Sequence, residues 1–537
     1  MMIGRPTRRP LASVGTLPRC KSAIAIALIA LFAGCGSESV DLTGTVAPPN
    51  ERPALASTYR PSGREAAGDV FVHLFEWRWS DISTECTSRL GPAGYRAVQV
   101  SPPQEHALVN GSPWWQRYQP VSYKLDRSRS GTGAEFAAMV QTCRAANVNI
   151  YVDAVINHMT AGSGTGSAGT VYTKTSYPPL FSAADFHPAC GVSNYADPVN
   201  VQDCELLGLA DLRTSVPSVQ RKIADYLIAL SRLGVAGFRI DAAKHMQPSE
   251  LDAIVALVNT TATAESRAQP YWYGEVIDYG NEGVRATDYF GLGYRSGGAA
   301  DISEFKYRGI GDKFMNAGNQ RVADLAQFSV GEWRVMPSDK AVSFIENHDT
   351  QRDGNPISYR DGDILRLAYV WLLAYPYGYP MVMSSYAFDR QSQGGRDRGP
   401  PSSSTGETRA VQCTSSWQTA AADVDWICEH RDPVLVRTVG FRKRMAGRDV
   451  SRVWTNGSNA VAFSRGTNGF VVINREDVQL TASIPTSLAA GTYCDVLTGG
   501  ATSGACAGLS VVVAVGGTAS VVVPARRAIV LEAGEQR

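Results

Sequence analysis

The 537-residue sequence has no CxxC pair among its 10 cysteines, which disfavours zinc ribbons and thioredoxin-like redox motifs. It also has no excess of charge, because 51 Lys+Arg stand against 50 Asp+Glu and the net charge is +1. Without a basic field, a general nucleic-acid binder is disfavoured. With 44% hydrophobic residues the composition is that of a globular protein, and the length suggests about three domains.

The N-terminal segment indicates export. Its apolar run, residues 23–33, is too short to span a bilayer but suits the core of a secretory signal, and it follows five basic residues: Arg5, Arg8, Arg9, Arg19 and Lys21. The run ends in Phe32-Ala33-Gly34-Cys35-Gly36, which resembles a lipoprotein processing site, although cleavage of a plain signal peptide is equally compatible. We therefore predict a signal peptide over 1–34 and, from its Ser-, Pro- and Gly-rich composition, a flexible tether over 35–67.

Export also implies disulfide bonds. Beyond Cys20 and Cys35, eight cysteines remain, an even number in an oxidising compartment. Close spacing favours the pairs Cys190/Cys204, Cys413/Cys428 and Cys494/Cys506, which leaves Cys86 with Cys143. The sequence by itself leaves that connectivity open.

Between residues 68 and 445, short apolar runs alternate with helical patterns. One helix is indicated by an apolar stripe at Ile223, Tyr226, Leu227, Leu230 and Leu233. Candidate strands are Val70–Leu74, Ala97–Val100, Asn149–Val155, Gly237–Ile240, Tyr271–Tyr273, Val342–Ile345 and Pro380–Met383. The alternation predicts an α/β fold with a parallel sheet, open or closed, and the polar residues that follow the strands favour a closed (β/α)8 barrel.

Two regions depart from this alternation. Residues 158–215 are rich in Gly, Ser, Thr and Pro, and because a structureless loop of that length is rare in a compact domain, we predict a small inserted subdomain. Residues 446–537 contain short β-type runs separated by Gly and Asn, which predicts a separate all-β domain.

Three carboxylates follow candidate barrel strands, where side chains surround one mouth: Asp241, Glu275 and Asp349. A pair of carboxylates that flanks a sugar can cleave a glycosidic bond with retention, one as nucleophile and one as acid/base. Arg239 lies two residues before Asp241 on the same strand face, where its charge is expected to lower the pKa of that carboxyl and keep it ionised. A purely structural Arg239–Asp241 salt bridge is the alternative.

Four blocks resemble the alpha-amylase family, specifically its animal-like, chloride-associated subgroup, which also occurs in bacteria. They are Asp153-Ala154-Val155-Ile156-Asn157-His158, Gly237-Phe238-Arg239-Ile240-Asp241-Ala242-Ala243-Lys244-His245, Gly274-Glu275-Val276-Ile277 and Phe344-Ile345-Glu346-Asn347-His348-Asp349. The resemblance implies a (β/α)8 barrel with an inserted calcium-binding subdomain, a C-terminal β-sandwich and the four disulfides proposed above.

The resemblance also implies roles for individual residues. Asp241 would be the nucleophile, Glu275 the acid/base and Asp349 the third carboxylate, which stabilises the transition state. Substrate would contact an aromatic wall, defined here as Trp114, Trp115 and Tyr118, together with Gln119, His158, Arg239, Lys244, His245 and His348. Flat rings can cover the apolar face of a glucose while polar groups bind its rim.

Calcium ligands implied by the resemblance are the side chains of Asn157 and Asp211 and the backbone carbonyls of Gln202 and His245, oxygen donors that suit Ca²⁺. Chloride in the subgroup is held by an Arg, an Asn and a second basic residue. Arg239 and Asn347 match the first two, but Met381 occupies the third position. A buried anion needs positive charge nearby, so we expect chloride neither to bind tightly nor to activate.

The resulting expectation is an exported enzyme that hydrolyses internal α-1,4 bonds of starch and glycogen with retention. The alternatives are a noncatalytic surface glucan-binding lipoprotein and an α-glucan transglycosylase. We expect no nucleic-acid partner, a monomer, and membrane association only through a lipid on Cys35.

Overall fold

The computed structural model describes residues 62–289, 300–331, 333–352, 354 and 357–537. The expected signal peptide, the lipidation site Cys35 and most of the expected tether lie outside the described residues. Among the described residues, no helix is long and apolar enough to cross a membrane.

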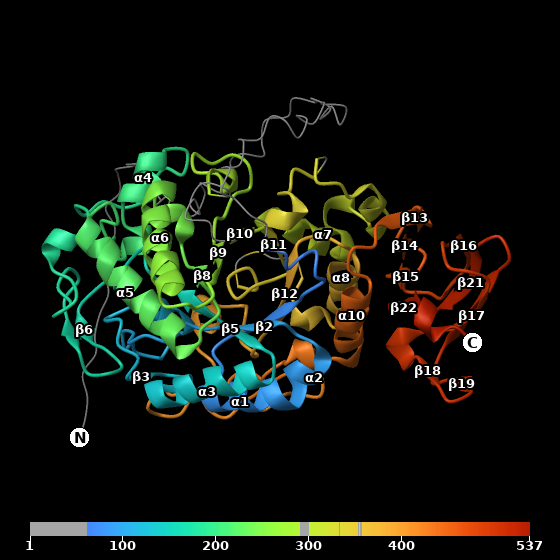
Figure 1. The fold of residues 1–537 in the computed structure, drawn as a ribbon, viewed down its shortest axis with the longest axis horizontal. Coiled ribbons are helices and arrows are strands. Elements are labelled where there is room, and N and C mark those ends of the chain that lie inside the picture. Colours follow the sequence, from blue (N-terminus) through green and yellow to red (C-terminus); the bar gives the residue numbers. More distant parts are fainter. Residues whose placement is uncertain (1–61, 290–299, 332, 353, 355–356) are drawn as a thin grey trace, which may run out of the picture. The chain divides into compact units, whose positions relative to one another are not determined.

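Eight parallel strands close into a barrel in the order β1-β12-β11-β10-β9-β8-β5-β2 (Figure 1). The strands are β1 Phe71–Leu74, β2 Ala97–Val100, β5 Asn149–Ala154, β8 Gly237–Ile240, β9 Tyr271–Gly274, β10 Ala300–Ser303, β11 Ala341–Ser343 and β12 Tyr379–Ser384. The closed (β/α)8 barrel predicted from the alternating pattern is confirmed.

One barrel strand, β10, is missing from the sequence prediction. Its sequence, Ala-Asp-Ile-Ser, has no apolar run, and Asp301 is nevertheless buried. The hydroxyls of Tyr271 and Ser62 donate to Asp301 at 2.6 and 2.9 Å, which compensates the carboxyl for its loss of water. A partner from a neighbouring strand therefore makes this polar strand possible, and periodicity cannot show such a partner.

Helices follow the barrel strands and cover them. In α5 the predicted stripe faces inward, with Ile223, Tyr226, Leu227 and Leu230 buried. The helices are α1 Trp79–Glu85, α2 Gly91–Ala93, α3 Gly133–Ala145, α4 Pro198–Asp203, α5 Pro217–Leu233, α6 Pro248–Ala264, α7 Gly309–Met315, α8 Asp363–Ala374, α9 Gln393–Asp397 and α10 Pro433–Arg444.

The long connection between β5 and β8 is folded. It contains the two-stranded pair β6 Gly164–Thr165 and β7 Val171–Tyr172, and also α4. Tyr177, Phe181 and Phe186 are buried in it and join the main apolar core. A second small pair, β3 Arg127–Ser128 and β4 Gly131–Thr132, lies between β2 and α3.

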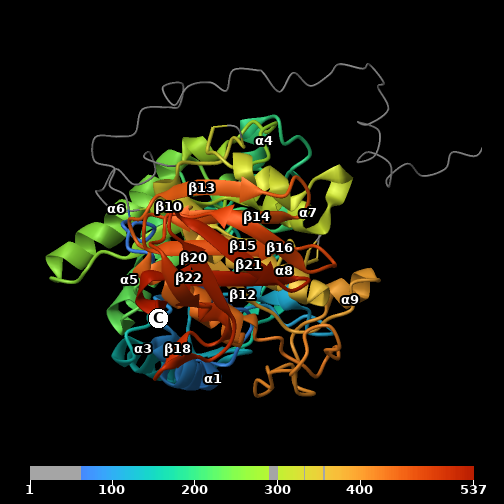
Figure 2. The ribbon, with the colours of Figure 1, turned by 90° about the vertical axis from the view of Figure 1, so that its right-hand side faces the viewer.

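The C-terminal strands form an all-β domain of two four-stranded sheets, β13-β14-β15-β22 and β16-β21-β20-β17, which Figure 2 views face on. Side chains of both sheets share one apolar core, as expected for a sandwich. The strands of these two sheets are β13 Val450–Thr455, β14 Ala460–Arg465, β15 Gly469–Asn474, β16 Leu480–Pro485, β17 Gly491–Cys494, β20 Ser510–Ala514, β21 Thr518–Val523 and β22 Arg527–Glu532. A separate two-stranded sheet is formed by β18 Ala501–Thr502 and β19 Ala505–Cys506.

The sandwich packs on the barrel through α8. The ring of Phe463 on β14 lies 5.5 Å from that of Trp371 on α8, and Arg465 donates to the carbonyls of Ala374 and Met445. The C-terminal domain is therefore joined to the barrel by apolar and polar contacts.

Residues 62–69, which include the end of the expected tether, contact the amino ends of the barrel strands. Besides the Ser62–Asp301 hydrogen bond, Arg64 pairs with Asp69 at 3.3 Å and Lys443 of α10 pairs with the same carboxylate at 2.7 Å. The chain thus enters the fold at the end of the barrel opposite to the carboxyl ends of the strands.

All four expected disulfide pairings are confirmed: Cys86–Cys143, Cys190–Cys204, Cys413–Cys428 and Cys494–Cys506. Cys86–Cys143 joins the C-terminal end of α1 to α3, while the other three close short loops.

Candidate active site

The three candidate catalytic carboxylates border one cleft of about 890 Å³. Asp241 directly follows β8, Glu275 directly follows β9 and Asp349 lies in the turn after β11. The cleft is lined by Trp114, Trp115, Tyr118, Gln119, His158, Ala161, Tyr195, Leu206, Leu207, Leu209, Asp241, Ala242, Lys244, His245, Glu275, Ile277, Glu282, His348, Asp349, Gln393 and Asp397. Every predicted catalytic and substrate residue except Arg239 is in this lining.

Arg239 lies beneath the cleft and binds three carboxylates. Its Nη1 lies 2.5 Å from Asp153 and 2.8 Å from Asp241, and its Nη2 pairs with Glu275. The strand register explains why these carboxylates meet at Arg239. Arg239 on β8 is in register with Asp153 on β5 and with Tyr273 on β9, two residues before Glu275. The second oxygen of Glu275 accepts a hydrogen bond from the Ala242 backbone at 3.0 Å.

One guanidinium cannot balance three buried carboxylates. Burial raises the pKa of Asp241 well above its usual range, the Arg239 charge opposes this rise, and the Glu275 and Asp153 carboxylates add to it. The sequence prediction that Arg239 depresses the pKa of Asp241 was therefore right about the contact and wrong about the net direction. Carboxylates this close together repel one another when all are ionised, so the set of three carboxyls favours keeping one proton. A general acid needs such a proton to donate.

Asp349 and His348 form the neighbouring edge of the cleft. The Asp349 side chain is 35% exposed and lies 3.3 Å from the Nε2 of His348. Burial and the Glu275 carboxylate raise the pKa of Asp349 to about 7. Burial and the nearby Arg239 hold the pKa of His348 well below its usual range, so this imidazole is neutral at pH 7 and can bond a sugar hydroxyl.

The His348 ring packs against the aromatic wall. It stacks between Tyr118 and Phe75, with ring centroids 5.2 and 4.8 Å apart, and meets the Trp114 ring edge-on, with the centroids 5.4 Å apart. His158 also belongs to this side, because its Nε2 lies 3.0 Å from the Tyr118 carbonyl, and burial lowers its pKa to about 4.

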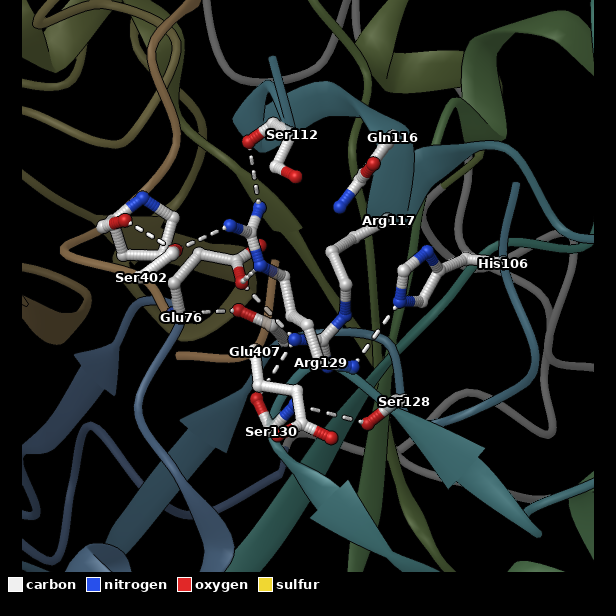
Figure 3. Close-up of polar contacts among 12 residues, drawn as sticks. Glu76, His106, Ser112, Gln116, Arg117, Ser128, Arg129, Ser130, Ser402 and Glu407 are labelled. Carbon is white, nitrogen blue, oxygen red and sulfur yellow. Dashed lines mark hydrogen bonds and ion pairs between the residues drawn. The ribbon is translucent and has the colours of Figure 1, made fainter. Parts of the chain in front are cut away.

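A buried polar cluster holds the turn that presents this wall (Figure 3). Arg117 donates to Glu76 at 3.0 Å and to Ser130 at 2.7 Å, and its side chain is fully buried. Arg129 donates to the Ser112 carbonyl at 3.1 Å and to Ser402 at 2.8 Å. Residues 112–118 are thus fixed from two sides.

The opposite side of the cleft lies next to Glu275. The Lys244 backbone donates to the Glu275 carbonyl, and the Lys244 ammonium pairs with Glu282 and lies 5.0 Å from the Tyr195 ring. Burial lowers the pKa of Lys244 to about 8. His245 contacts the same ring edge-on, at 6.4 Å.

Several lining residues were not singled out from the sequence. Tyr195 and Leu207 belong to the long connection, which has no periodicity, and Gln393 and Asp397 belong to the five-residue helix α9. Asp153 belongs to one of the four blocks that resemble the alpha-amylase family. In the sequence, only the alternation of side chains along β5 indicates that it faces Arg239.

The four residues expected to hold calcium fall on two pairs of adjoining segments beside the cleft, Asn157 with Asp211 and Gln202 with His245. Asn157 and Asp211 belong to adjoining backbone segments, since the Leu212 N–H donates to the Asn157 carbonyl at 3.0 Å. Val201 and His245 are also adjacent, with His245 Nδ1 2.8 Å from the Val201 carbonyl. The Oδ1 atoms of Asn157 and Asp211 are buried without a hydrogen-bond partner, a costly state that a cation would relieve.

The residues considered for chloride also come together. Arg239, Asn347 and Met381 line one small cavity below the cleft, with Gln99, Tyr273, Glu275, Ser303, Val342, Phe344 and His348. Within this described lining, Arg239 is the only arginine or lysine.

A closed parallel barrel with clustered carboxylates and an aromatic-lined cleft at the carboxyl ends of its strands defines a glycoside hydrolase. Two family profiles agree: the alpha-amylase catalytic domain matches residues 98–274 and the alpha-amylase C-terminal all-beta domain matches residues 454–534. The chain belongs to the alpha-amylase family.

Individual relatives support this assignment. An alpha-amylase of Thermomonospora curvata is 43% identical over 513 residues, 94% of this chain and 78% of its own. The pancreatic alpha-amylase of Sus scrofa is 42% identical over 490 residues, 86% of this chain and 93% of its own. The crystal structure of alpha-amylase I from Eisenia fetida superposes with a TM-score of 0.78 at 38% identity and covers 89% of this chain and 99% of that one.

The shared contacts of Arg239 predict a change in pH dependence. In Arg239→Gln, Asp153 and Asp241 lose the charge that lowers their pKa values. We expect the acid limb of the kcat–pH profile to move upward by at least about one unit, and kcat at pH 7 to fall at least about 100-fold. Arg232→Gln, which alters an exposed Arg232–Glu265 pair, is the control. An acid limb that stays in place in Arg239→Gln would contradict this account of the site.

Proposed function

We propose that the chain is an endo-acting alpha-amylase that hydrolyses α-1,4 bonds of starch and glycogen with retention of configuration. The observation that supports this best is the joint binding of Asp241 and Glu275 by Arg239 at the floor of an aromatic-lined cleft. Retaining glycosidases need two carboxyl groups about 5 Å apart, and two carboxylates on the terminal nitrogens of one guanidinium lie side by side.

In the first step, Asp241 attacks the anomeric carbon and Glu275 protonates the leaving glycosidic oxygen. Charge that develops on the sugar ring faces Asp349, whose carboxylate stabilises it. Arg239 fixes the orientation of both Asp241 and Glu275. The His158 and His348 imidazoles, together with the aromatic wall, bind the sugar on one side of the bond.

In the second step, Glu275 takes a proton from water and the resulting hydroxide displaces Asp241 from the anomeric carbon. Before this step, the chain that was released when Glu275 protonated it leaves along the side formed by Lys244, His245 and Tyr195, which adjoins Glu275, so that water can take its place. Lining on both sides of the carboxylates suits cleavage within a chain, and the crystal structure of a Glu-to-Gln variant of the Eisenia fetida enzyme with maltohexaose supports a linear glucan as ligand.

The alternatives use the same cleft. A transglycosylase would transfer the glycosyl group from Asp241 to a sugar instead of to water, and would release longer chains. A noncatalytic glucan-binding lipoprotein would have no need of three carboxylates in this arrangement. We infer export from the expected signal segment. A lipid on Cys35 would also anchor the exported chain to a membrane.

Asp241→Asn tests the nucleophile. With soluble starch, the purified mature chain is expected to release reducing ends with rapid loss of iodine staining, whereas Asp241→Asn should lose at least about 10⁴-fold in kcat and still bind glucan. Asp225→Asn, on the exposed face of α5, is the matched control and should keep wild-type activity. Full activity of Asp241→Asn would remove Asp241 as nucleophile, and predominantly longer products would favour transfer.

We also propose that calcium binds between the long connection and the barrel. The side-chain oxygens of Asn157 and Asp211 and the carbonyls of Gln202 and His245 would hold it. Support comes from the two buried, unpartnered Oδ1 atoms and from the all-oxygen donor set. Among the described residues, no group of three or more His, Cys, Asp and Glu side chains forms an alternative metal site. The ion's contribution would be structural, since it joins segments far apart in the chain.

Removal of calcium should therefore lower thermal stability. With excess chelator we expect a lower Tm, restored by added Ca²⁺, because a ligand at 100 times its Kd stabilises by about 3 kcal/mol. Asp211→Asn should abolish most of the Ca²⁺ response. Asp185→Asn, in the same connection but paired with Lys222, should retain it. An equal Tm with and without Ca²⁺ would refute the proposal.

We further propose that the chain belongs with the animal-like subgroup but is independent of chloride. Met381 supplies a thioether where a second cation would attract the anion, and Arg239 is already engaged by three carboxylates. Addition of chloride to chloride-free enzyme should change kcat less than about twofold, whereas Met381→Lys should gain a chloride response. Sodium acetate at equal ionic strength controls for salt. A large activation of the wild type by chloride would overturn this view.

A further inference from the structure

Arg352 is a buried cation behind the aromatic wall. It lies three residues after Asp349, and only 4% of its surface is exposed. Its guanidinium carbon lies 4.3 Å from the ring centroid of Phe388 and 4.9 Å from that of Trp114, and the rings of Phe75 and Tyr386 both lie at 5.4 Å. Four aromatic rings therefore surround one positive charge, and each contact is attractive.

The planar guanidinium also donates in three directions. Nη1 donates to the His348 carbonyl, Nε to the Arg396 carbonyl at 3.0 Å and Nη2 to the Tyr386 hydroxyl at 2.8 Å. Over the described part of the chain, no carboxylate lies within ion-pair distance of Arg352. Its charge is therefore offset by rings, by carbonyl dipoles and by a longer-range interaction with the Asp349 carboxylate, and a lysine ammonium could not reproduce this fork.

These contacts connect three separate parts of the cleft. Trp114 belongs to the aromatic wall, His348 adjoins Asp349, and Arg396 belongs to α9, whose Gln393 and Asp397 line the cleft. Arg352 itself is not in the lining, so it does not touch substrate. Arg352 therefore links these three segments to one side chain.

We propose that Arg352 is a positioning residue that holds Trp114, His348 and α9 in the arrangement that binds and cleaves the glucan chain. The inference rests on the proposed function and extends it to a residue outside the catalytic and binding set. Without Arg352, the Trp114 ring loses its charged neighbour and the His348 backbone loses a donor. The α9 segment loses its bond to the turn that contains Asp349 as well.

Arg352→Gln tests this role on a defined maltooligosaccharide such as maltoheptaose. KM should rise because Trp114 and α9 shift, and kcat should fall because the His348–Asp349 edge shifts. The combined loss in kcat/KM should be about 10- to 100-fold, since displacements of about 1 Å cost that much. Arg360→Gln is the matched control: Arg360 also lies over Phe388, at 4.6 Å, but it contacts Tyr359 and the Phe388 carbonyl rather than the cleft.

A double-mutant cycle with Trp114→Ala separates positioning from loss of general stability. The part of the effect that passes through Trp114 should vanish in the Trp114→Ala background, so Arg352→Gln should raise KM by a smaller factor there, while the loss in kcat that passes through His348 remains. Should Arg352→Gln fail to fold, Arg352→Lys keeps the charge and should lose about 3- to 10-fold in kcat/KM.

Three results would overturn the inference in an active wild-type enzyme. They are unchanged kcat/KM in Arg352→Gln or Arg352→Lys, equal losses in Arg352→Gln and Arg360→Gln, and equal losses with and without Trp114. A wild-type chain without activity on any α-glucan would instead overturn the proposed function, and this inference with it.

Discussion

The active site depends on one electrostatic constraint, the sharing of Arg239 by three carboxylates. Asp153, Asp241 and Glu275 come from three adjacent strands, and only the register of β5, β8 and β9 brings them to one guanidinium. A shift of one residue in any of these strands would turn its carboxylate to the other face of the barrel. The strand register that closes the barrel therefore also sets the geometry of the catalytic carboxylates.

The aromatic wall depends on charge in a similar way. The turn that presents Trp114 is bound by Arg117 and Arg129 on one side and faces Arg352 on the other. These buried cations satisfy backbone carbonyls that a loop would otherwise expose to water. The wall, whose residues form the 3-10 helix Trp114–Tyr118, is consequently held rigidly, which is what stacking against a flexible sugar chain requires.

Much of the fold and the centre of the site could be predicted from the sequence, because apolar strands followed by carboxylates leave a strong local signal. Asp241 and Glu275 directly follow such strands. The sequence prediction missed β10, because this strand is polar and relies on two partners distant in the chain, Tyr271 and Ser62. It missed Tyr195 because this residue lies in a connection without periodicity. The direction of the Asp241 pKa shift was missed because it follows from burial, which only the folded structure reveals.

The entry of the chain at the amino ends of the strands has a practical consequence. Ser62 is bound at Asp301, at one end of the barrel, while the cleft opens beyond the carboxyl ends of the strands at the other. Material attached upstream of residue 62 therefore joins the barrel on the side away from the cleft. A support bound directly at Ser62 would thus lie at the end of the barrel opposite to the cleft, which opens toward a substrate as bulky as a starch granule.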